Sequence, residues 1–374
     1  MAGLYIHIPF CKKKCSYCDF YSTSHELNEP LFVERLKHEL SIRKRFLPDP
    51  SIGTIYFGGG TPSLLSPKGM QEILGAIANE LNVEPSPEIT LEANPDDLSH
   101  EYLSQIHSIG VNRLSVGVQS FSDSDLKFLG RRHSSEQAMD AVRTAAKVGF
   151  SNIGIDLIYG LPSSTIEGWK ANLIAAFKLP IQHLSCYHLT FEKGTPLYTL
   201  CRKGLTLPVD DQRSQDEYQV LCSMAAEHGF MQYEVSNFAR EGFQSTHNSS
   251  YWKQIPYLGL GPSAHSYNGM VRAWNPSSVQ QWAKALDGDH PYIETEELTT
   301  SDKLNEYLMS SLRTVWGADT EYIHREFGAK SAINFGTIAK RYIAQGLMQQ
   351  QEHSVRITQH ALFVSDGIIA DFFV

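Results

Sequence analysis

The chain has 374 residues, a length that predicts one large domain with a smaller unit appended to it. Hydrophobic residues make up 42% of the chain and charged residues 20%, as in an ordinary soluble globular protein. A formal net charge of −9 argues against a general binder of nucleic acids or anionic membranes. The sequence contains no apolar run of roughly 18 residues and no charged-then-apolar signal pattern, so we expect neither a transmembrane helix nor a signal peptide.

The first predicted strand, residues 4–8, leads into three cysteines with C-x3-C-x2-C spacing: Cys11, Cys15 and Cys18. A structural zinc site takes four ligands, and a disulfide framework takes an even number of cysteines in a small secreted domain. Three thiolates on one loop therefore favour a 4Fe-4S cluster with one iron left open to a small molecule. Zinc remains the alternative. Oxygen-sensitive thiolates of this kind fit a reducing cytoplasm.

The second predicted strand, residues 54–57, runs into Gly58, Gly59 and Gly60 and then Thr61. Glycines carry no Cβ atom, so the backbone of such a run can approach a ligand closely. The run completes neither the dinucleotide-binding motif nor the P-loop motif. It therefore indicates a ligand-binding turn without naming the ligand.

Strands and helices alternate through the first two hundred residues. We predict strands at 4–8, 54–57, 89–93, 113–118, 152–158 and 183–190, and helices near 30–46, 67–81, 99–108, 134–148 and 164–177. This alternation implies parallel strands with right-handed crossovers, and six units predict an α/β fold, a partial (β/α)6 TIM-like barrel. Reactive groups of such barrels gather at the carboxyl ends of the strands, where the cysteine and glycine motifs both lie.

Polar residues interrupt three of the predicted strands near their ends. Glu92 ends the third, Gln119 ends the fourth, and Asp156 lies in the fifth. A carboxylate inside an apolar strand is costly unless it is paired or contacts a ligand. Two readings follow: a buried ion pair with a basic residue such as Arg113 or Arg131, or the polar lining of a binding site.

The regular alternation of predicted strands and helices ends at about residue 205. A long amphipathic helix is predicted over 210–228, and the stretch 231–275 reads as irregular, aromatic and polar. We expect three parts: the barrel at 1–205, a connecting segment at 206–298 and a C-terminal α+β domain at 299–374.

The C-terminal domain is predicted to be winged-helix-like, with a helix over 333–345 and a hairpin formed by 347–350 and 355–358. Such domains often bind DNA, but no basic patch accompanies this one. We therefore interpret it as a lid or docking surface for the barrel.

The cysteine loop after the first strand and the glycine run after the second together resemble the radical S-adenosylmethionine (SAM) superfamily. The resemblance implies that Cys11, Cys15 and Cys18 hold a 4Fe-4S cluster. It also implies that the amino and carboxylate groups of SAM chelate the open iron.

Four segments, 5–11, 57–62, 117–121 and 129–133, are similar to the oxygen-independent coproporphyrinogen oxidase group. This similarity implies that Tyr5, Gly59 and Glu92 contact the cluster-bound SAM. It further implies a second SAM site lined by Tyr17, Gly60, Thr61, Gln119, Arg131 and Asp156, with additional contacts from Thr190 and His265.

Two departures separate the chain from the coproporphyrinogen oxidase itself. Phe20 stands where that enzyme has a fourth cysteine. Only four residues precede Tyr5, so we expect the enzyme's N-terminal extension to be absent. Both departures resemble the HemW family, whose implied role is that of a haem chaperone delivering haem to an acceptor protein. A loose association with a membrane, through this acceptor, is compatible with the sequence.

Residues 247–252 match the H-N-x-x-Y-W pattern of HemW proteins. The resemblance implies that His247, Asn248, Tyr251 and Trp252 contact haem, with His247 on the haem iron. Neutral imidazole is a good axial ligand, and aromatic rings offer a flat wall to a porphyrin. Without that context, a histidine among aromatics is more often a surface or core residue.

Two other functions stay open at this stage. The runner-up is an oxygen-independent coproporphyrinogen III dehydrogenase, a radical SAM enzyme of oxidative decarboxylation in porphyrin synthesis. A zinc-dependent scaffold without catalytic activity is a more distant reading.

Overall fold

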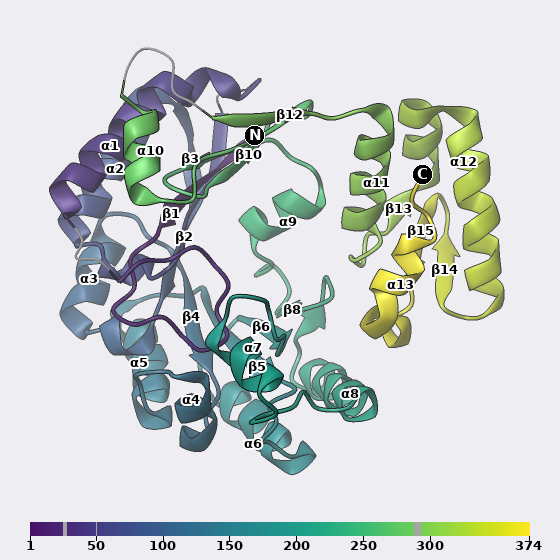
Figure 1. The fold of residues 1–374 in the computed structure, drawn as a ribbon, viewed down its shortest axis with the longest axis horizontal. Coiled ribbons are helices and arrows are strands. Elements are labelled where there is room, and N and C mark those ends of the chain that lie inside the picture. The colour runs from purple at the N-terminus through teal and green to yellow at the C-terminus, as the bar shows by residue number, and fades with distance from the viewer. Residues whose placement is uncertain (25–27, 50, 288–292) are drawn as a thin grey trace.

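The computed structural model describes residues 1–24, 28–49, 51–287 and 293–374 (Figure 1). Within them lie a sheet of 12 strands, in the order β12-β11-β10-β9-β1-β2-β3-β4-β5-β6-β8-β7, and a separate sheet of 3 strands, β13-β15-β14. Figure 1 shows the large sheet and its covering helices on one side and the C-terminal elements from α11 onward on the other. No helix in the described part of the chain is long and apolar enough to cross a membrane.

Six neighbouring parallel strands form the centre of the large sheet: β1 (Ala2–Ile8), β2 (Ser51–Gly59), β3 (Asn82–Ala93), β4 (Arg113–Gln119), β5 (Ile153–Tyr159) and β6 (His183–His188). The helices between them are α1 (Glu29–Arg43), α2 (Pro67–Glu80), α3 (His100–Ser108), α5 (Ser135–Val148) and α6 (Ile166–Phe177). This alternation confirms the predicted partial (β/α)6 barrel. β4 is buried along its whole length, and β1 and β5 are buried at all but one position each, which explains their nearly unbroken apolar sequences.

Local capping explains where the barrel helices begin. Ser66, Ser99, Ser134 and Thr165 each precede a helix, and each side-chain oxygen accepts a hydrogen bond from a backbone N–H of the first turn. Such caps satisfy donors that have no partner inside the helix, which is why serine and threonine mark these starts.

The prediction missed two short helices, α4 (Asp123–Leu129) and α7 (Pro196–Arg202). Each has 7 residues, too few to show a helical repeat of apolar positions. The predicted sixth strand is also too long: β6 ends at His188, so Thr190 lies in the loop that follows.

The stretch 231–275 was wrongly predicted to be irregular. After α8 (Asp211–Glu227) it contains β7 (Met231–Gln232), β8 (Asn237–Ala239), α9 (Thr246–Trp252), β9 (Tyr257–Leu260), β10 (His265–Tyr267) and β11 (Val271–Trp274), followed by α10 (Val279–Ala285) and β12 (Glu294–Glu297). β8 pairs antiparallel with β6, and β9 pairs parallel with β1, so this stretch extends the barrel sheet at both edges. Strands of two to four residues are too short to show alternation of apolar and polar residues, so the sequence does not predict them.

A buried polar cluster fastens α1 to the segments that follow β9 and β11, on the far side of β1 from β2. The Glu39 carboxylate, fully buried, accepts hydrogen bonds from Arg43 Nη1 at 2.8 Å, Gly261 N at 2.8 Å, Asn275 Nδ2 at 2.6 Å and Trp282 Nε1 at 2.9 Å. A buried ion pair is tolerated when further hydrogen bonds satisfy its remaining groups, as here. The cluster therefore holds the late strands beside β1.

The C-terminal domain comprises α11 (Thr300–Ser311), β13 (Ala318–Asp319), α12 (Thr320–Ala344), β14 (Met348–Gln351), β15 (Ser354–Ile357) and α13 (Ser365–Ala370). Gly328 has φ of +84° and breaks α12, and the part after it contains nearly all of the predicted helix 333–345. β14 and β15 pair antiparallel, which confirms the predicted hairpin. The winged-helix-like arrangement of helix and hairpin is thus present, with β13 as an added strand.

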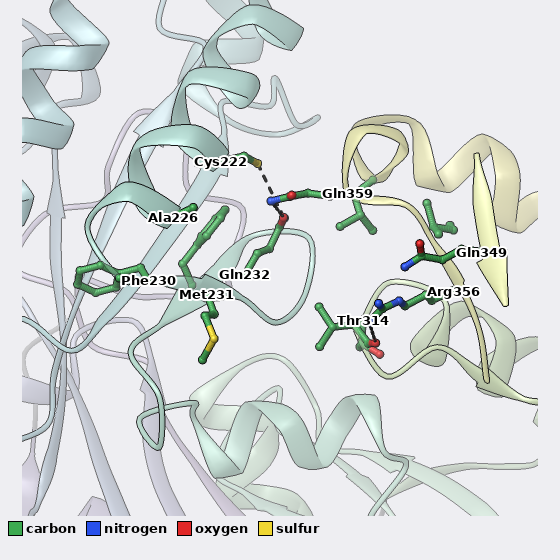
Figure 2. A pocket seen from close by; sticks show the side chains of 14 residues that line it. Cys222, Ala226, Phe230, Met231, Gln232, Thr314, Gln349, Arg356 and Gln359 are labelled. Carbon is green, nitrogen blue, oxygen red and sulfur yellow. Dashed lines mark hydrogen bonds between the residues drawn. The ribbon is translucent and has the colours of Figure 1, made fainter. Parts of the chain in front are cut away.

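A cavity of about 460 Å³ lies between the barrel and the C-terminal domain (Figure 2). Phe230, Met231 and Gln232 line it from the barrel side, and Gln349 and Arg356 line it from the hairpin. At this junction Gln359 Nε2 donates to Gln232 Oε1 at 3.3 Å, and Val315 N donates to Tyr233 O at 3.1 Å. None of the candidate site residues lines this cavity.

Candidate functional site

A cavity of about 390 Å³ opens at the carboxyl ends of the barrel strands. It brings together the cysteine loop, the glycine run and the polar strand ends. The candidate residues that line it are Cys11, Cys15, Tyr17, Cys18, Gly59, Gly60, Thr61, Glu92, Gln119, Arg131, Asp156 and Thr190. Residues far apart in the sequence thus meet where parallel strands end together.

The cysteine loop is held by backbone hydrogen bonds at its base. Cys11 N donates to Thr23 O at 2.9 Å, and Thr23 N donates to Pro9 O at 2.7 Å. Farther along, Ser16 N donates to Leu129 O at 3.2 Å, which ties the loop to the end of α4. These contacts fix the loop above the mouth of the barrel.

The three cysteines have the chemistry that an iron–sulfur cluster requires. All are free thiols, half-buried at the cavity. Thr61 Oγ1 donates to Cys11 Sγ at 3.3 Å, and Arg131 Nη1 donates to Cys15 Sγ at 3.4 Å. Such donors favour sulfur in its thiolate form, the form that binds metal. In the chain without a cluster, burial raises the pKa of the Cys18 thiol to about 11.

No three His, Cys, Asp or Glu side chains in the described part of the chain are grouped so that they could hold a metal ion. Cubane clusters differ from single-ion sites because each cysteine binds its own iron. The three half-buried thiols around one cavity, with hydrogen-bond donors to two of the sulfurs, therefore fit a cluster.

The glycine run packs against the strand that delivers the cysteine loop. Gly60 N donates to Ile8 O at 2.8 Å, and a Cβ atom on Gly60 would lie 2.9 Å from backbone atoms of Ile8 and Pro9. Gly59 has φ of +112°, and a Cβ there would lie 2.6 Å from the ring of His7. Close approach to β1, as well as any approach to a ligand, therefore requires these glycines.

Two half-buried carboxylates, those of Glu92 and Asp156, face the cavity. Burial, reinforced by nearby Asp156, raises the pKa of Glu92 to about 7, against the lowering effect of hydrogen bonds from Tyr56 and Gly59. Burial also raises the pKa of Asp156, while hydrogen bonds from Ser185 and Ser115 and the charge of Arg113 lower it. Glu92 is thus poised to change charge near neutral pH.

The structure does not support a buried pair between Asp156 and Arg131. Arg131 Nη2 donates to Gly117 O at 2.7 Å and also to Asn94 Oδ1, while Nη1 serves Cys15. The nitrogen Nε of Arg113 has no hydrogen-bond partner among the described residues. Asp156 therefore keeps its place in the lining of the cavity rather than in an ion pair with Arg131.

Two of the predicted SAM contacts lie outside this cavity. The hydroxyl of Tyr5 on β1 lies 3.1 Å from His7 Nδ1, behind the glycine run. His265 on β10 is exposed, and its ring stacks on Trp274 with the ring centroids 6.1 Å apart. Their contacts with SAM stay predictions.

The H-N-x-x-Y-W residues form the short helix α9, which packs against β2 and α11. His247 is only 2% exposed, with Nδ1 2.7 Å from Thr54 Oγ1 and Nε2 2.9 Å from the Tyr251 hydroxyl. Burial lowers the pKa of His247 to about 3, so the imidazole is neutral. Both ring nitrogens are engaged within the protein, and ligation of iron by either requires that its contact break.

The other members of this motif are partly buried. Asn248 Nδ2 donates to the Tyr233 hydroxyl at 3.5 Å. The indole Nε1 of Trp252 is buried without a partner among the described residues. A haem contact by Asn248, Tyr251 or Trp252 stays a prediction.

Sequence reasoning missed Asn94 and Tyr56. Asn94 follows Glu92 and Ala93 at the end of β3, lines the cavity, and donates through Nδ2 to Thr61 Oγ1 at 3.3 Å. Its position at the end of a strand is a signal from which the sequence could have predicted a residue of the site. Tyr56 donates from its hydroxyl to Glu92 Oε1 at 2.8 Å, which no local pattern reveals because the two residues lie on different strands.

Comparisons with known proteins identify the family to which this chain belongs. The model of the radical SAM superfamily matches residues 5–173, and that of the HemN C-terminal domain matches residues 298–364. The Bacillus subtilis protein named "Heme chaperone HemW" is 34% identical over 380 residues, covering 100% of this chain and 99% of the relative. The chain belongs to the HemW family. The "Heme chaperone HemW" of Lactococcus lactis is also 34% identical, across 98% of this chain and 96% of its own length.

Beyond the bacterial HemW proteins, a Bos taurus protein named "Radical S-adenosyl methionine domain-containing protein 1, mitochondrial" is 32% identical across 98% of this chain and 86% of its own length. Among solved structures, the coproporphyrinogen III oxidase HemN of Escherichia coli superposes with a TM-score of 0.85, covering 99% of this chain and 89% of that one. At 22% sequence identity, this likeness shows that the chain shares the fold of HemN.

Proposed function

We propose that this protein is a haem chaperone that binds haem, a 4Fe-4S cluster and SAM and delivers haem to an acceptor protein in the cytoplasm. The observation that carries the proposal is the match at 34% identity over the full length to relatives named as haem chaperones. The likeness to coproporphyrinogen III oxidase is one of fold. Phe20, which is 65% exposed where that enzyme has a fourth cysteine, is a further difference in favour of the chaperone.

In this proposal Cys11, Cys15 and Cys18 hold the cluster. When bound, a cluster of this kind can pass one electron to SAM. Thr61 and Arg131 stabilise thiolate sulfur by donating to Cys11 and Cys15. Glu92 offers a carboxylate oxygen at the cavity to the SAM ammonium, and its ionisation near neutral pH makes that contact dependent on pH.

The remaining candidate residues have supporting roles in the proposal. Those that line the cavity beside Glu92 would hold the second SAM: Tyr17, Gly60, Thr61, Gln119, Arg131, Asp156 and Thr190. Haem would contact the motif of α9 in the segment 206–298. The domain 299–374 would serve as a lid or as a docking surface for the acceptor.

Anaerobic haem titration tests the proposal. We expect a Soret band that saturates at about one haem per chain, because the motif offers one axial histidine. In His247→Ala the band should weaken or shift, since alanine cannot ligate iron, while the cluster absorbance survives because its ligands lie on another loop. His324→Ala, which removes an exposed histidine from α12, is the matched control and should leave the Soret band unchanged.

Failure of the unmodified protein to bind haem would contradict the chaperone. A Soret band that is unchanged in His247→Ala would place the iron ligand at another residue and would leave His247 in its hydrogen bonds to Thr54 and Tyr251.

A further inference from the structure

We propose that Tyr56, held in place by His247 of α9, is a positioning residue of the SAM site: its hydroxyl fixes the carboxylate of Glu92. The inference rests on the proposed function, because it takes Glu92 as a SAM contact. It assigns to the H-N-x-x-Y-W helix a role in SAM binding that is separate from any contact with haem.

The first step is the orientation of the carboxylate. Tyr56 lies on β2 and Glu92 on the neighbouring strand β3, where Tyr56 pairs with Thr90. The Tyr56 hydroxyl donates to Glu92 Oε1 at 2.8 Å, and Gly59 N donates to Oε2 at 3.1 Å. Each oxygen thus has a fixed donor from β2. With both oxygens held, the plane of the carboxylate is set before a ligand arrives, which is how a binding site gains from preorganisation.

The second step is the position of the tyrosine ring. The His247 ring stacks on Tyr56, with centroids 4.9 Å apart and planes at 22°. The Tyr5 ring also stacks on Tyr56, with centroids 6.1 Å apart and planes at 26°. His247 is held in turn through its two nitrogens by Thr54 and Tyr251. His247 thus supports one face of the Tyr56 ring from a position fixed by these two contacts.

The third step is the attachment of α9 to the strand that carries Glu92. The backbone N–H groups of Thr246 and His247 donate to the Glu88 carboxylate at 2.9 and 2.8 Å. Glu88 and Glu92 both lie on β3. Helix α9 is therefore fastened to β3 through Glu88 and reaches Glu92 again through Tyr56, so that the helix and the carboxylate hold one relative position.

The pH dependence of SAM binding separates positioning from simple core packing. The titratable and charged groups that act on Glu92 are Tyr5, Tyr56, Arg113, Asp156, Tyr187 and Tyr251. Among them, the Tyr56 hydroxyl lowers the Glu92 pKa by donating to the ionised form. Loss of that hydroxyl raises the Glu92 pKa further, so the carboxylate forms only at higher pH. A packing role alone would not move this midpoint.

Calorimetric titration of cluster-loaded Tyr56→Phe with SAM, under anaerobic conditions and across neutral pH, is the test. The change removes one oxygen and keeps the stacked ring. We expect SAM affinity to fall about tenfold at neutral pH, the equivalent of about 1.4 kcal/mol. We also expect the midpoint of the pH profile to move upward. In a Glu92→Gln background the same change should have little further effect, because Tyr56 acts through the carboxylate.

Tyr342→Phe is the matched control, because Tyr342 also donates from its hydroxyl to a carboxylate, that of Asp371 at 2.7 Å, on the exposed surface of the C-terminal domain. It should leave SAM binding unchanged. Unchanged affinity and pH profile in Tyr56→Phe, with SAM binding lost in Glu92→Ala, would overturn the positioning role and leave the proposed function standing. Unchanged affinity in Glu92→Ala would overturn the proposed SAM contact itself.

Substitution of His247 distinguishes support of Tyr56 from ligation of iron. His247→Ala removes the stacked ring and should weaken SAM binding. His247→Phe restores a flat ring over Tyr56 but cannot ligate iron, so SAM affinity should recover relative to His247→Ala while any histidine signature of haem stays lost. Equal SAM affinities in the unmodified protein and His247→Ala, with the folded state verified by circular dichroism, would contradict the support of Tyr56 by this ring.

Discussion

Replacing Cys11, Cys15 or Cys18 with alanine is expected to abolish the visible absorbance of the 4Fe-4S cluster and, with it, SAM binding. Each thiolate supplies one iron with its only protein ligand, and the loop offers no spare. Phe20 stands where the related oxidase has a fourth cysteine, and a phenylalanine side chain cannot bind iron. The measurement is absorbance together with iron and sulfide content after anaerobic reconstitution.

The three other cysteines are matched controls. Cys186 is buried in β6, Cys201 lies in α7 and Cys222 in α8. Alanine at any of these positions should leave the cluster intact. A full complement of four irons in Cys15→Ala would show that the assignment of the ligands is wrong.

Gly60→Val is expected to weaken SAM binding by roughly tenfold to a hundredfold, because relieving an overpacked contact costs about 1–3 kcal/mol. A Cβ atom at this position would lie 2.9 Å from the backbone of Ile8 and Pro9, where β1 ends and the cysteine loop begins. The backbone cannot yield without moving the loop or the glycine run. Calorimetric titration of the cluster-loaded variant with SAM measures the loss.

Gly75→Val provides the control for this substitution. Gly75 is an exposed glycine of α2, and a Cβ atom there would have no neighbour within 4 Å. SAM affinity should stay unchanged in this variant. Unchanged affinity in Gly60→Val would count against the packing of the glycine run on β1 as a requirement of the site.

Local patterns made much of the barrel predictable. Its strands are apolar runs between amphipathic helices, and a parallel sheet buried on both faces imposes that pattern on each strand separately. The place of the site followed from the same rule: Cys11, Gly60 and Glu92 all belong to the ends of parallel strands, which meet at one edge.

The pairings between distant segments could not be predicted in this way. β9 lies beside β1 although some 250 residues separate them in the sequence. Strands of two to four residues are also too short to show the alternation of apolar and polar residues that predicts a strand. The ends of the sheet are therefore set by long-range contacts, such as those of Glu39 with Gly261 and Trp282.

The motif at 247–252 shows the limit of reading a site from residue types. The pattern suggested a haem contact but not the helix that carries it, and the direction of the His247 ring depends on Thr54 and Tyr251, whose side chains contact its two nitrogens. The same motif that suggests an iron ligand also places a neutral ring on Tyr56. Only the structure shows that the motif is joined to Glu92.

Anaerobic turnover with coproporphyrinogen III tests the central claim most directly. The sample is one cluster-loaded preparation that binds haem, supplied with reductant, SAM and an electron acceptor, and protoporphyrinogen is the product to be measured. We predict that no protoporphyrinogen forms while the protein retains its ability to bind haem. Accumulation of protoporphyrinogen would contradict the haem chaperone and establish a coproporphyrinogen III dehydrogenase.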